Sequence, residues 1–586
     1  MTFNRYYQEE LNYLRELGAE FALRNTSLAP FLSHESFDPD VERLLEGFAF
    51  LTGRLRQKLD DELPEFSQSL TQLILPQMLA PVPARTVVEF HPIAEAGLAR
   101  RTVPRGTPIA SRPVQGQRCR FRTCYDVRLT PARILDAGAS TLGRRGRVHL
   151  ELQLTHDAQF AALGLDRLRL YLAPWRSGAL ARSLYCALRT QCQGVHVQDA
   201  AGHGFSLPAG AVRPVGLQPD EAVLEYPSKA VPGYRLFQEY FAFPDKFMFL
   251  DICGLEQTAE FSGERLILLF DLEEPLADGP GLTPDRLRLN ATPVVNLFDA
   301  NAAPVRIEHR KAAYRVTARD SAGNRYMIHS VQRVTGETSS EGGTVSESIE
   351  YAPLESFEVL GQVADQACFS LNRSLNPVSG EVDTHMTFTR IDGLPHLSET
   401  ETVSITAACT NGATAADIPA GHIDQRVDGS PNFATFRDIQ PIRSEIPPPL
   451  DAALMRRLIA GMACNFSSLL DVEALRALMA TCNTGIHVDH WERQRHAQLS
   501  EGMQAISVKP LDWIIAGVPV RGSDITVTVD ESQFGGIADA YLFSVALGAL
   551  LDERAAVNTV HRLTVVARGE NRRFRGTVRR GRKAVL

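Results

Sequence analysis

The sequence has no two cysteines spaced as CxxC and none of the common motifs of nucleotide-, metal- or serine-dependent enzymes. Its nine cysteines are scattered over 586 residues, so neither a zinc ribbon nor a thioredoxin-like redox site is indicated. GxxxxGK[ST], GxGxxG after a strand, HExxH, GxSxG and the EF-hand loop are all missing. These absences argue against an enzyme, and we predict no catalytic residue, cofactor or metal ion.

The chain also lacks an apolar run of about 18 residues, the length that a membrane-spanning helix needs. Its first residues mix charged and apolar side chains, without the apolar core and cleavage site of a secretory signal. Scattered thiols are typical of a reducing compartment. We therefore expect a cytoplasmic protein. The net charge of −8 argues against nucleic-acid binding, which usually needs a basic surface.

What the sequence does contain is ordinary apolar material, with 44% hydrophobic and 22% charged residues, enough for several cores. Length alone predicts three or four domains, as a soft expectation. We expect a multidomain α+β fold. It would comprise an N-terminal helical region (1–84), a β-rich domain (85–330), a second β-rich domain (331–448) and a C-terminal α/β domain (449–586). The β-rich parts are expected to be sandwich- or barrel-like.

The N-terminal region carries apolar residues at helical spacing. One amphipathic helix is marked by Tyr7, Leu11, Leu14 and Phe21. A second is expected to begin at Asp38–Pro39, because aspartate caps a first turn and proline fits its first position. Its apolar face holds Leu44, Leu45, Phe48, Leu51, Leu55 and Leu59. A third helix should begin near Pro64 and end at Pro76, and the proline-rich stretch 76–84 indicates a boundary.

From about residue 85 the apolar period changes to two, which is typical of strands with one buried face. The alternation is found at 148–154, 167–172, 286–289, 304–307, 402–406 and 524–529. The stretch 266–270 (LILLF) is apolar throughout and predicts a strand buried on both faces. The polar stretch 335–348 predicts a mobile loop, and the prolines of 444–449 predict a linker.

Helical spacing returns after this linker. One apolar stripe consists of Leu450, Leu454, Leu458 and Met462. Asp471 is expected to cap the helix that follows. Residues 500–586 predict the order strand, strand, helix, strand. The helix, at about 538–552, is apolar nearly all round and should be buried against a sheet or a partner.

One cluster of residues could in principle bind a metal ion. It consists of Cys482, His487, Asp489, His490 and His496. A zinc site needs three or four ligands that converge on one point, and this spacing matches no established ligand pattern. A solvated, irregular segment is the favoured interpretation.

For two further charged features, a structural explanation is favoured over a functional one. Asp530 and Glu531 are neighbours in an extended stretch, so their side chains should point apart and form no acid–base pair. The basic tail 567–583 could contact an acidic partner or nucleic acid. A solvated surface or a frayed terminus is favoured, and a protein contact comes second.

The densest feature is the aromatic segment 233–251, GYRLFQEYFAFPDKFMFLD. Its first interpretation is core packing around a turn at Pro244–Asp245. The alternative is an exposed aromatic patch for a protein partner, with Tyr240 and Phe241 among the contact residues.

The aromatic segment resembles a signature of the TssF family of type VI secretion, also called VasA or ImpG. The resemblance continues in the N-terminal FNRYYQEELNYLRELGAEFA and in six further blocks. These are 38–84, LNATPVVNLFD (289–299), ACTNGATAADIP (408–419), 454–479, 530–553 and the closing GRKAVL. The blocks are collinear and span nearly the whole chain, so the chain is identified as a member of this family.

The resemblance implies a structural wedge component of the baseplate. Two copies would associate with one TssG-like subunit, which recruits TssK-like subunits, and a TssE-like subunit would join the wedge. Six wedges would surround the spike hub and nucleate tube and sheath. The TssK-like subunits would link the platform to the membrane complex, at the inner face of the cytoplasmic membrane. The alternatives are a wedge protein of another contractile, phage-tail-like particle, a metal-dependent enzyme, and a stand-alone ligand-binding β-module.

The amphipathic stripes of the first 80 residues suit a helical bundle shared between chains, because an isolated helix gains most of its stability by burying such a stripe. The residues expected to contact partner subunits are Leu11, Leu14, Leu44, Phe48, Leu51, Leu55, Tyr240 and Phe241.

Overall fold

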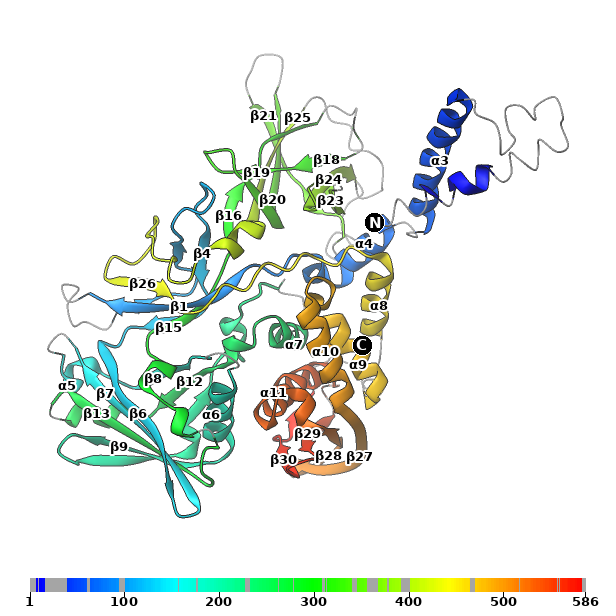
Figure 1. Ribbon diagram of the computed structural model, residues 1–586. Helices are drawn as coiled ribbons and strands as arrows, with labels where there is room; N and C mark the ends of the chain where they lie inside the picture. Colours follow the sequence, from blue (N-terminus) through cyan, green and yellow to red (C-terminus); the bar gives the residue numbers. More distant parts are fainter. Residues whose placement is uncertain are drawn as a thin grey trace.

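A computed structural model (Figure 1) gives the fold of this chain, and it confirms a multidomain α+β architecture. The residues that the structure describes are 7–8, 10–15, 39–60, 64–93, 101–155, 158–174, 178–226, 232–261, 263–277, 279–307, 311, 313–339, 345–355, 367–376, 379–390, 401–463, 470–515, 517–555, 557 and 559–581. No helix in these ranges is long and apolar enough to cross a membrane.

The second and third predicted N-terminal helices are present. Of the first, the structure describes helical backbone at 7–8 and 10–15, and Phe21 lies outside the described residues. Helix α3 (Pro39–Asp60) begins at the expected proline, and α4 (Pro64–Ile74) ends before the short helix η1 (Pro76–Met78). Figure 1 shows α3 extending away from the body of the molecule, whereas α4 lies against it. Helix α4 packs on α8 (Ala452–Ala463) and on strand β23 (Ala367–Leu375), so it connects distant parts of the chain.

A central sheet combines three remote segments of the sequence. Its strand order is β26 (Ala434–Asp438), β1 (Arg85–Pro92), β15 (Ala291–Val295), β4 (Arg120–Thr123) and β3 (Pro108–Ala110). Beside it, the stretch 444–449, predicted to be a linker, is partly paired with the body, because Val82 and Ile446 exchange backbone hydrogen bonds of 2.8 and 2.9 Å.

The second part of the body is a pair of antiparallel sheets that share one apolar core. The first sheet has the order β10 (Gly204–Pro208), β9 (Cys192–Asp199), β13 (Arg265–Leu272), β7 (Arg145–Leu154), β6 (Ala132–Leu142). The second has the order β11 (Val212–Pro214), β12 (Phe249–Cys253), β8 (Arg167–Leu172), β14 (Leu287–Arg288). Helix α6 (Ala179–Thr190) contacts strands of both sheets.

The alternation read from the sequence is confirmed in β7, where every second residue from Val148 to Leu154 is buried. The interpretation of 266–270 as buried on both faces is wrong. In β13, Leu266, Leu268 and Phe270 are buried, but Ile267 and Leu269 on the opposite face are only half-buried. An apolar run therefore indicates a strand without fixing how many faces are covered.

A third β-rich part has its own core. One sheet has the order β16 (Phe298–Asn301), β25 (Glu401–Thr410), β20 (Arg325–Ser339), β19 (Ala318–Arg319), joined by β17 (Val305–Ile307) and β21 (Val345–Glu350). The other has the order β18 (Tyr314–Val316), β24 (Val382–Arg390), β23, β22 (Ala352–Pro353).

Two expectations fail in this part. The stretch 335–348 is largely strand, because Thr335–Ser339 and Val345–Ser348 pair as the antiparallel strands β20 and β21, and residues 340–344 lie outside the described ranges. The domain boundary expected between 330 and 331 falls inside the continuous strand β20. Threonine and valine favour strands even where most of their neighbours are polar.

The C-terminal α/β part has the predicted order of elements. Its helices are α8, α9 (Val472–Cys482), α10 (His490–Gly502) and α11 (Ile537–Arg554). Its sheet consists of β27 (Met503–Ile515), β28 (Val518–Val529), β29 (Val560–Ala567), β30 (Arg572–Arg575) and β31 (Arg579–Arg580). Helix α11 connects the parallel strands β28 and β29 and is buried, as its apolar surface predicts.

Candidate partner-binding surfaces

Helix α3 carries large apolar side chains that the described part of the chain leaves uncovered. The exposed fractions are 74% for Leu44, 57% for Phe48 and 65% for Leu51. These residues are spaced by four and three positions, so they share one face of the helix. Ala49 is fully buried, which shows that a different side of α3 is covered. The exposed face of Leu44, Phe48 and Leu51 is hereafter called the α3 apolar face.

The other predicted contact residues of the N-terminal region differ among themselves. Leu11, in the helical stretch 10–15, is buried at 4% exposure, and Leu14 is half-buried. Leu55 lies within α3, but its side chain is outside the part that the structure describes. Among the predicted residues of this region whose side chains the structure describes, the three of the α3 apolar face are the ones open to a partner.

The aromatic segment lies in the interior, in α7 (Pro232–Ala242), η5 (Pro244–Phe247) and β12. Tyr240 and Phe241 are 2% and 5% exposed, and their rings meet edge to face with centroids 5.1 Å apart. The rings of Phe237 and Tyr240 also contact Phe543 of α11. The hypothesis of an exposed patch at Tyr240 and Phe241 is therefore wrong, because these rings fill the junction between α7 and α11.

This core also encloses an ion pair. Lys246 Nζ lies 2.5 Å from Glu239 Oε2, and both side chains are completely buried. The other carboxylate oxygen of Glu239 accepts hydrogen bonds from the backbone N–H groups of Val223 and Leu224, at 2.8 and 2.9 Å. Burial lowers the pKa of Lys246, and the carboxylate of Glu239 opposes that shift. The pair fixes the 223–224 loop against α7 and η5.

The candidate metal residues do not form a cluster. Within the described ranges, no three histidine, cysteine, aspartate or glutamate side chains come together in a way that could hold a metal ion. Asp489 instead caps α10, accepting a hydrogen bond of 2.8 Å from the N–H of Trp491. Cys482 and His496 are buried, and burial lowers the pKa of His496.

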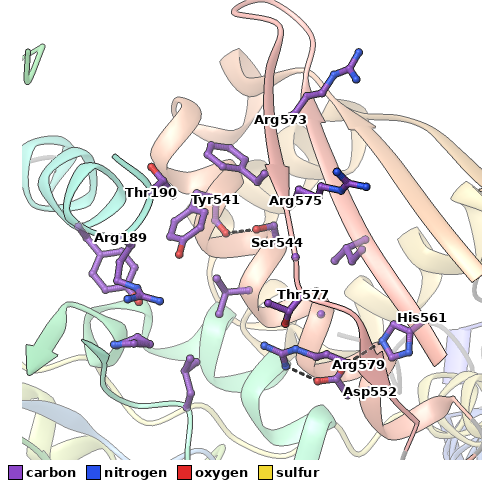
Figure 2. A pocket seen from close by; sticks show the side chains of 18 residues that line it. Arg189, Thr190, Tyr541, Ser544, Asp552, His561, Arg573, Arg575, Thr577 and Arg579 are labelled. Carbon is purple, nitrogen blue, oxygen red and sulfur yellow. Dashed lines mark hydrogen bonds and ion pairs between the residues drawn. The ribbon is translucent and has the colours of Figure 1, made fainter. Parts of the chain in front are cut away.

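A cavity of about 560 Å³ lies between α6 and the C-terminal sheet (Figure 2). At one end His561 Nε2 lies 2.9 Å from Asp552, which also pairs with Arg579. Ser544 donates its hydroxyl to the backbone oxygen of Tyr541 at 2.6 Å, away from this histidine. These contacts connect α11 to β29 and β31, and they do not bring Ser544 together with His561.

The two charged sequence features have structural roles. Asp530 accepts from the N–H of Ser532, and Glu531 accepts from the N–H groups of Gly569 and Glu570 at 3.1 and 2.7 Å. The basic tail is not a frayed terminus as far as residue 580, because it includes β30 and β31. Arg572 of this tail pairs with Glu274 at 2.8 Å.

The sequence and the fold of this chain are similar to those of known proteins. The family model described as "Type VI secretion system, TssF" matches residues 1–583. The chain is similar to "Type VI secretion system component TssF1" of Pseudomonas aeruginosa, with 28% identity over 96% of each chain.

Two solved structures are similar as well. A chain of the TssK–TssF–TssG baseplate subcomplex, solved by cryo-electron microscopy, has a TM-score of 0.75 at 26% identity. That match covers 92% of this chain and 99% of the other. A chain of the baseplate complex from the type VI secretion system has a TM-score of 0.65 at 22% identity, with full coverage of both, and shows the same fold.

Proposed function

Because the chain belongs to the TssF family and is a baseplate component of the type VI secretion system, we propose that it acts by presenting the α3 apolar face to a TssG-like subunit. The observation that carries this proposal is the exposure of Leu44, Phe48 and Leu51 on a helix that extends from the body (Figure 1). Contiguous apolar surface of this kind is typical of a protein–protein interface.

The complex in which the similar chain was solved contains TssK and TssG, which supports subunits of these two kinds as partners. Two copies of the chain would associate with one TssG-like subunit, and TssK-like and TssE-like subunits would complete the wedge around the spike hub. In this role the chain contributes contact surface and transforms no substrate. It would act in the cytoplasm, at the inner face of the cytoplasmic membrane, where the assembled baseplate docks.

The test is a triple substitution of the α3 apolar face, Leu44→Asp, Phe48→Asp and Leu51→Asp. We expect it to abolish co-purification with a co-expressed TssG-like subunit, because three carboxylates would have to be buried in the interface. The matched control replaces two exposed arginines of the same helix, Arg43→Asp and Arg54→Asp. A folded triple variant that still co-purifies would contradict the proposal.

A further inference from the structure

The C-terminal sheet has two faces of different character. Helix α11 packs against β29 on one face, where Val527, Val529 and Val565 are buried. On the opposite face Thr526 and Thr564 are only half-buried. This opposite face is hereafter called the outer face. It comprises every second residue of 505–513, 520–528, 560–566 and 573–575, together with Arg580.

Basic side chains dominate the outer face. Directly opposed residues of neighbouring strands lie on the same side of a sheet, and Thr564 opposes Arg575 whereas Val566 opposes Arg573. Figure 2 shows the side chains of Arg573 and Arg575 pointing away from Tyr541, which belongs to α11. The face holds five basic residues and one acidic residue, namely Lys509, Arg562, Arg573, Arg575, Arg580 and Asp524.

The acidic residue of the outer face is already engaged. Both carboxylate oxygens of Asp524 accept hydrogen bonds from Arg562, at 3.1 and 2.6 Å. The hydrogen bond from Arg562 lowers the pKa of Asp524, and the charges of Arg575 and Lys509 act in the same direction. Lys509, Arg573 and Arg575 are exposed and form no ion pair with the residues that the structure describes.

Other arginines of the basic tail differ from these three. Arg572 pairs with Glu274, and Arg579 pairs with the buried Asp552 of α11. Both of these contacts link parts of the same chain, so they stabilise its fold. The exposed cations of the outer face have no such role within the described chain.

An exposed apolar side chain adjoins these cations. Leu511 is 45% exposed and lies on the outer face, two residues from Lys509. Next to it the ring of Trp513 lies against Gly522, where an added Cβ would meet the ring at 2.5 Å. Interfaces between proteins combine apolar contacts with a polar, charged surround, and arginine is enriched in them. The outer face has this combination.

Two other occupants do not fit the outer face. A second copy of the chain could not bind with the same face, because cations would oppose cations. Nucleic acid would need aromatic rings on which bases stack, and Trp513 is the one aromatic residue of the face. Its ring is covered by the guanidinium of Arg562, 5.7 Å from the ring centroid. The net charge of −8 also opposes a polyanion of this length.

We propose that the outer face binds an acidic surface of another baseplate subunit, whose aspartate or glutamate side chains pair with Arg573 and Arg575 while an apolar side chain covers Leu511. Guanidinium groups match a carboxylate in geometry and charge. This inference rests on the proposed assembly of the chain with other subunits, and it concerns a surface distinct from the α3 apolar face.

The test uses the full chain co-expressed with its TssG-like and TssK-like subunits. A photo-reactive benzoylphenylalanine replaces Ser507, an exposed residue of the outer face. The matched control carries it at Val508, the next residue of the same strand, which is 36% exposed and points to the opposite face. We expect cross-linking from position 507 to a partner segment that contains Asp or Glu, and none from position 508.

The outcomes separate this inference from the proposed function. A complex that forms without a cross-link from position 507, with equal cross-linking from both positions, or with a cross-link to a segment lacking Asp and Glu overturns the docking surface and leaves the assembly role standing. Failure to form any complex overturns both. Binding of the isolated chain to a duplex oligonucleotide or to phosphatidylglycerol vesicles, without a cross-link from position 507, would assign the outer face to that polyanion and overturn the docking surface.

Charge reversal tests the role of the unpaired arginines. The double variant Arg573→Glu, Arg575→Glu should change the Tm of the isolated chain little, because neither side chain forms an ion pair within the described chain. In the complex it should reduce the cross-linking yield from position 507 about tenfold or more, because carboxylates would then oppose carboxylates. The matched control, Arg144→Glu with Arg145→Glu, reverses two exposed arginines between β6 and β7 and should leave the yield unchanged.

Two results would contradict the role of these arginines. A folded double variant that cross-links as well as the wild type would show that their charge does not hold a partner. A Tm lowered as far as in Arg579→Met, which removes the partner of the buried Asp552, would show that they serve the fold. Either result overturns the docking surface.

Discussion

Gln68 and Arg373 are joined by two hydrogen bonds between one side-chain amide and one backbone unit. Gln68 Nε2 donates to the backbone oxygen of Arg373 at 2.8 Å, and the N–H of Arg373 donates to Gln68 Oε1 at 2.9 Å. Strand β24 pairs with one edge of β23 along its whole length, whereas β22 pairs with the other edge only at Cys368 and Phe369. Among the described residues, this second edge therefore has no strand neighbour at Arg373. The side-chain amide of Gln68 provides the two hydrogen bonds that a neighbouring strand would provide, and it thereby links α4 to the third β-rich part.

Removing this amide should loosen that junction. Gln68→Ala leaves two buried backbone groups without partners, and we expect a loss of about 1–3 kcal/mol in the free energy of unfolding. The measurement is chemical denaturation, together with hydrogen exchange of the Arg373 amide, which should become faster. The control is Gln72→Ala, one turn further along the same helix. Equal effects of the two substitutions would contradict the role assigned to Gln68.

The buried pair of Glu239 and Lys246 predicts a non-additive result. Lys246→Met alone should destabilise the protein by about 3–5 kcal/mol, because the buried carboxylate of Glu239 loses its close cation and keeps only Arg235, whose Nε lies 3.8 Å away. Adding Glu239→Gln should recover a large part of this loss, since the amide oxygen can still accept from Val223 and Leu224. Urea unfolding of the two single variants and the double variant measures the coupling. Additive losses would refute it.

His329 predicts a dependence of stability on pH. Burial, assisted by the positive charges of Arg373 and Arg122, lowers the pKa of His329 to about 3, from about 6.5 in the unfolded chain. The unfolded state therefore binds the proton first, so stability from this group is present above pH 6.5 and is lost as the pH falls toward 3.

The variant His329→Gln should remove this dependence. Between pH 7 and pH 5 we expect the wild type to lose about 1–2 kcal/mol relative to the variant. Denaturation at several pH values measures the difference, and His490→Gln, at an exposed position, serves as the control. Parallel pH profiles for wild type and His329→Gln would contradict the effect of burial.

The cap of α9 predicts a smaller effect. Asp471 accepts from the N–H groups of Glu473 and Ala474 at 3.2 and 3.3 Å. Asp471→Ala should cost about 1 kcal/mol and speed hydrogen exchange in the first turn of α9, whereas Asp471→Asn should largely preserve both. Unchanged exchange in the alanine variant would show that neighbouring packing alone holds this end of the helix.

Local chemistry explains what the sequence predicted well. The cap at Asp471, the start of α3 at Pro39 and the alternation in β7 each depend on a few neighbouring residues. The central sheet could not be predicted, because β1 pairs with β15 and β26, both of which lie hundreds of residues away in the chain. Pairing at such separation is set by the packing of the whole molecule.

The exposure of the candidate partner-binding residues also could not be predicted from the sequence. An amphipathic stripe predicts that a helix will be covered, and it does not say whether its own chain or a partner covers it. Leu44, Phe48 and Leu51 of the α3 stripe are exposed, whereas Tyr240 and Phe241 are buried.

The most direct test of the assembly role is the mass of the particle obtained when this chain is co-expressed with its TssG-like and TssK-like subunits. Native mass spectrometry should find a stable complex with two copies of this chain for each TssG-like subunit. A chain that is recovered alone, as a folded monomer, under conditions in which the other subunits are well expressed would contradict the account.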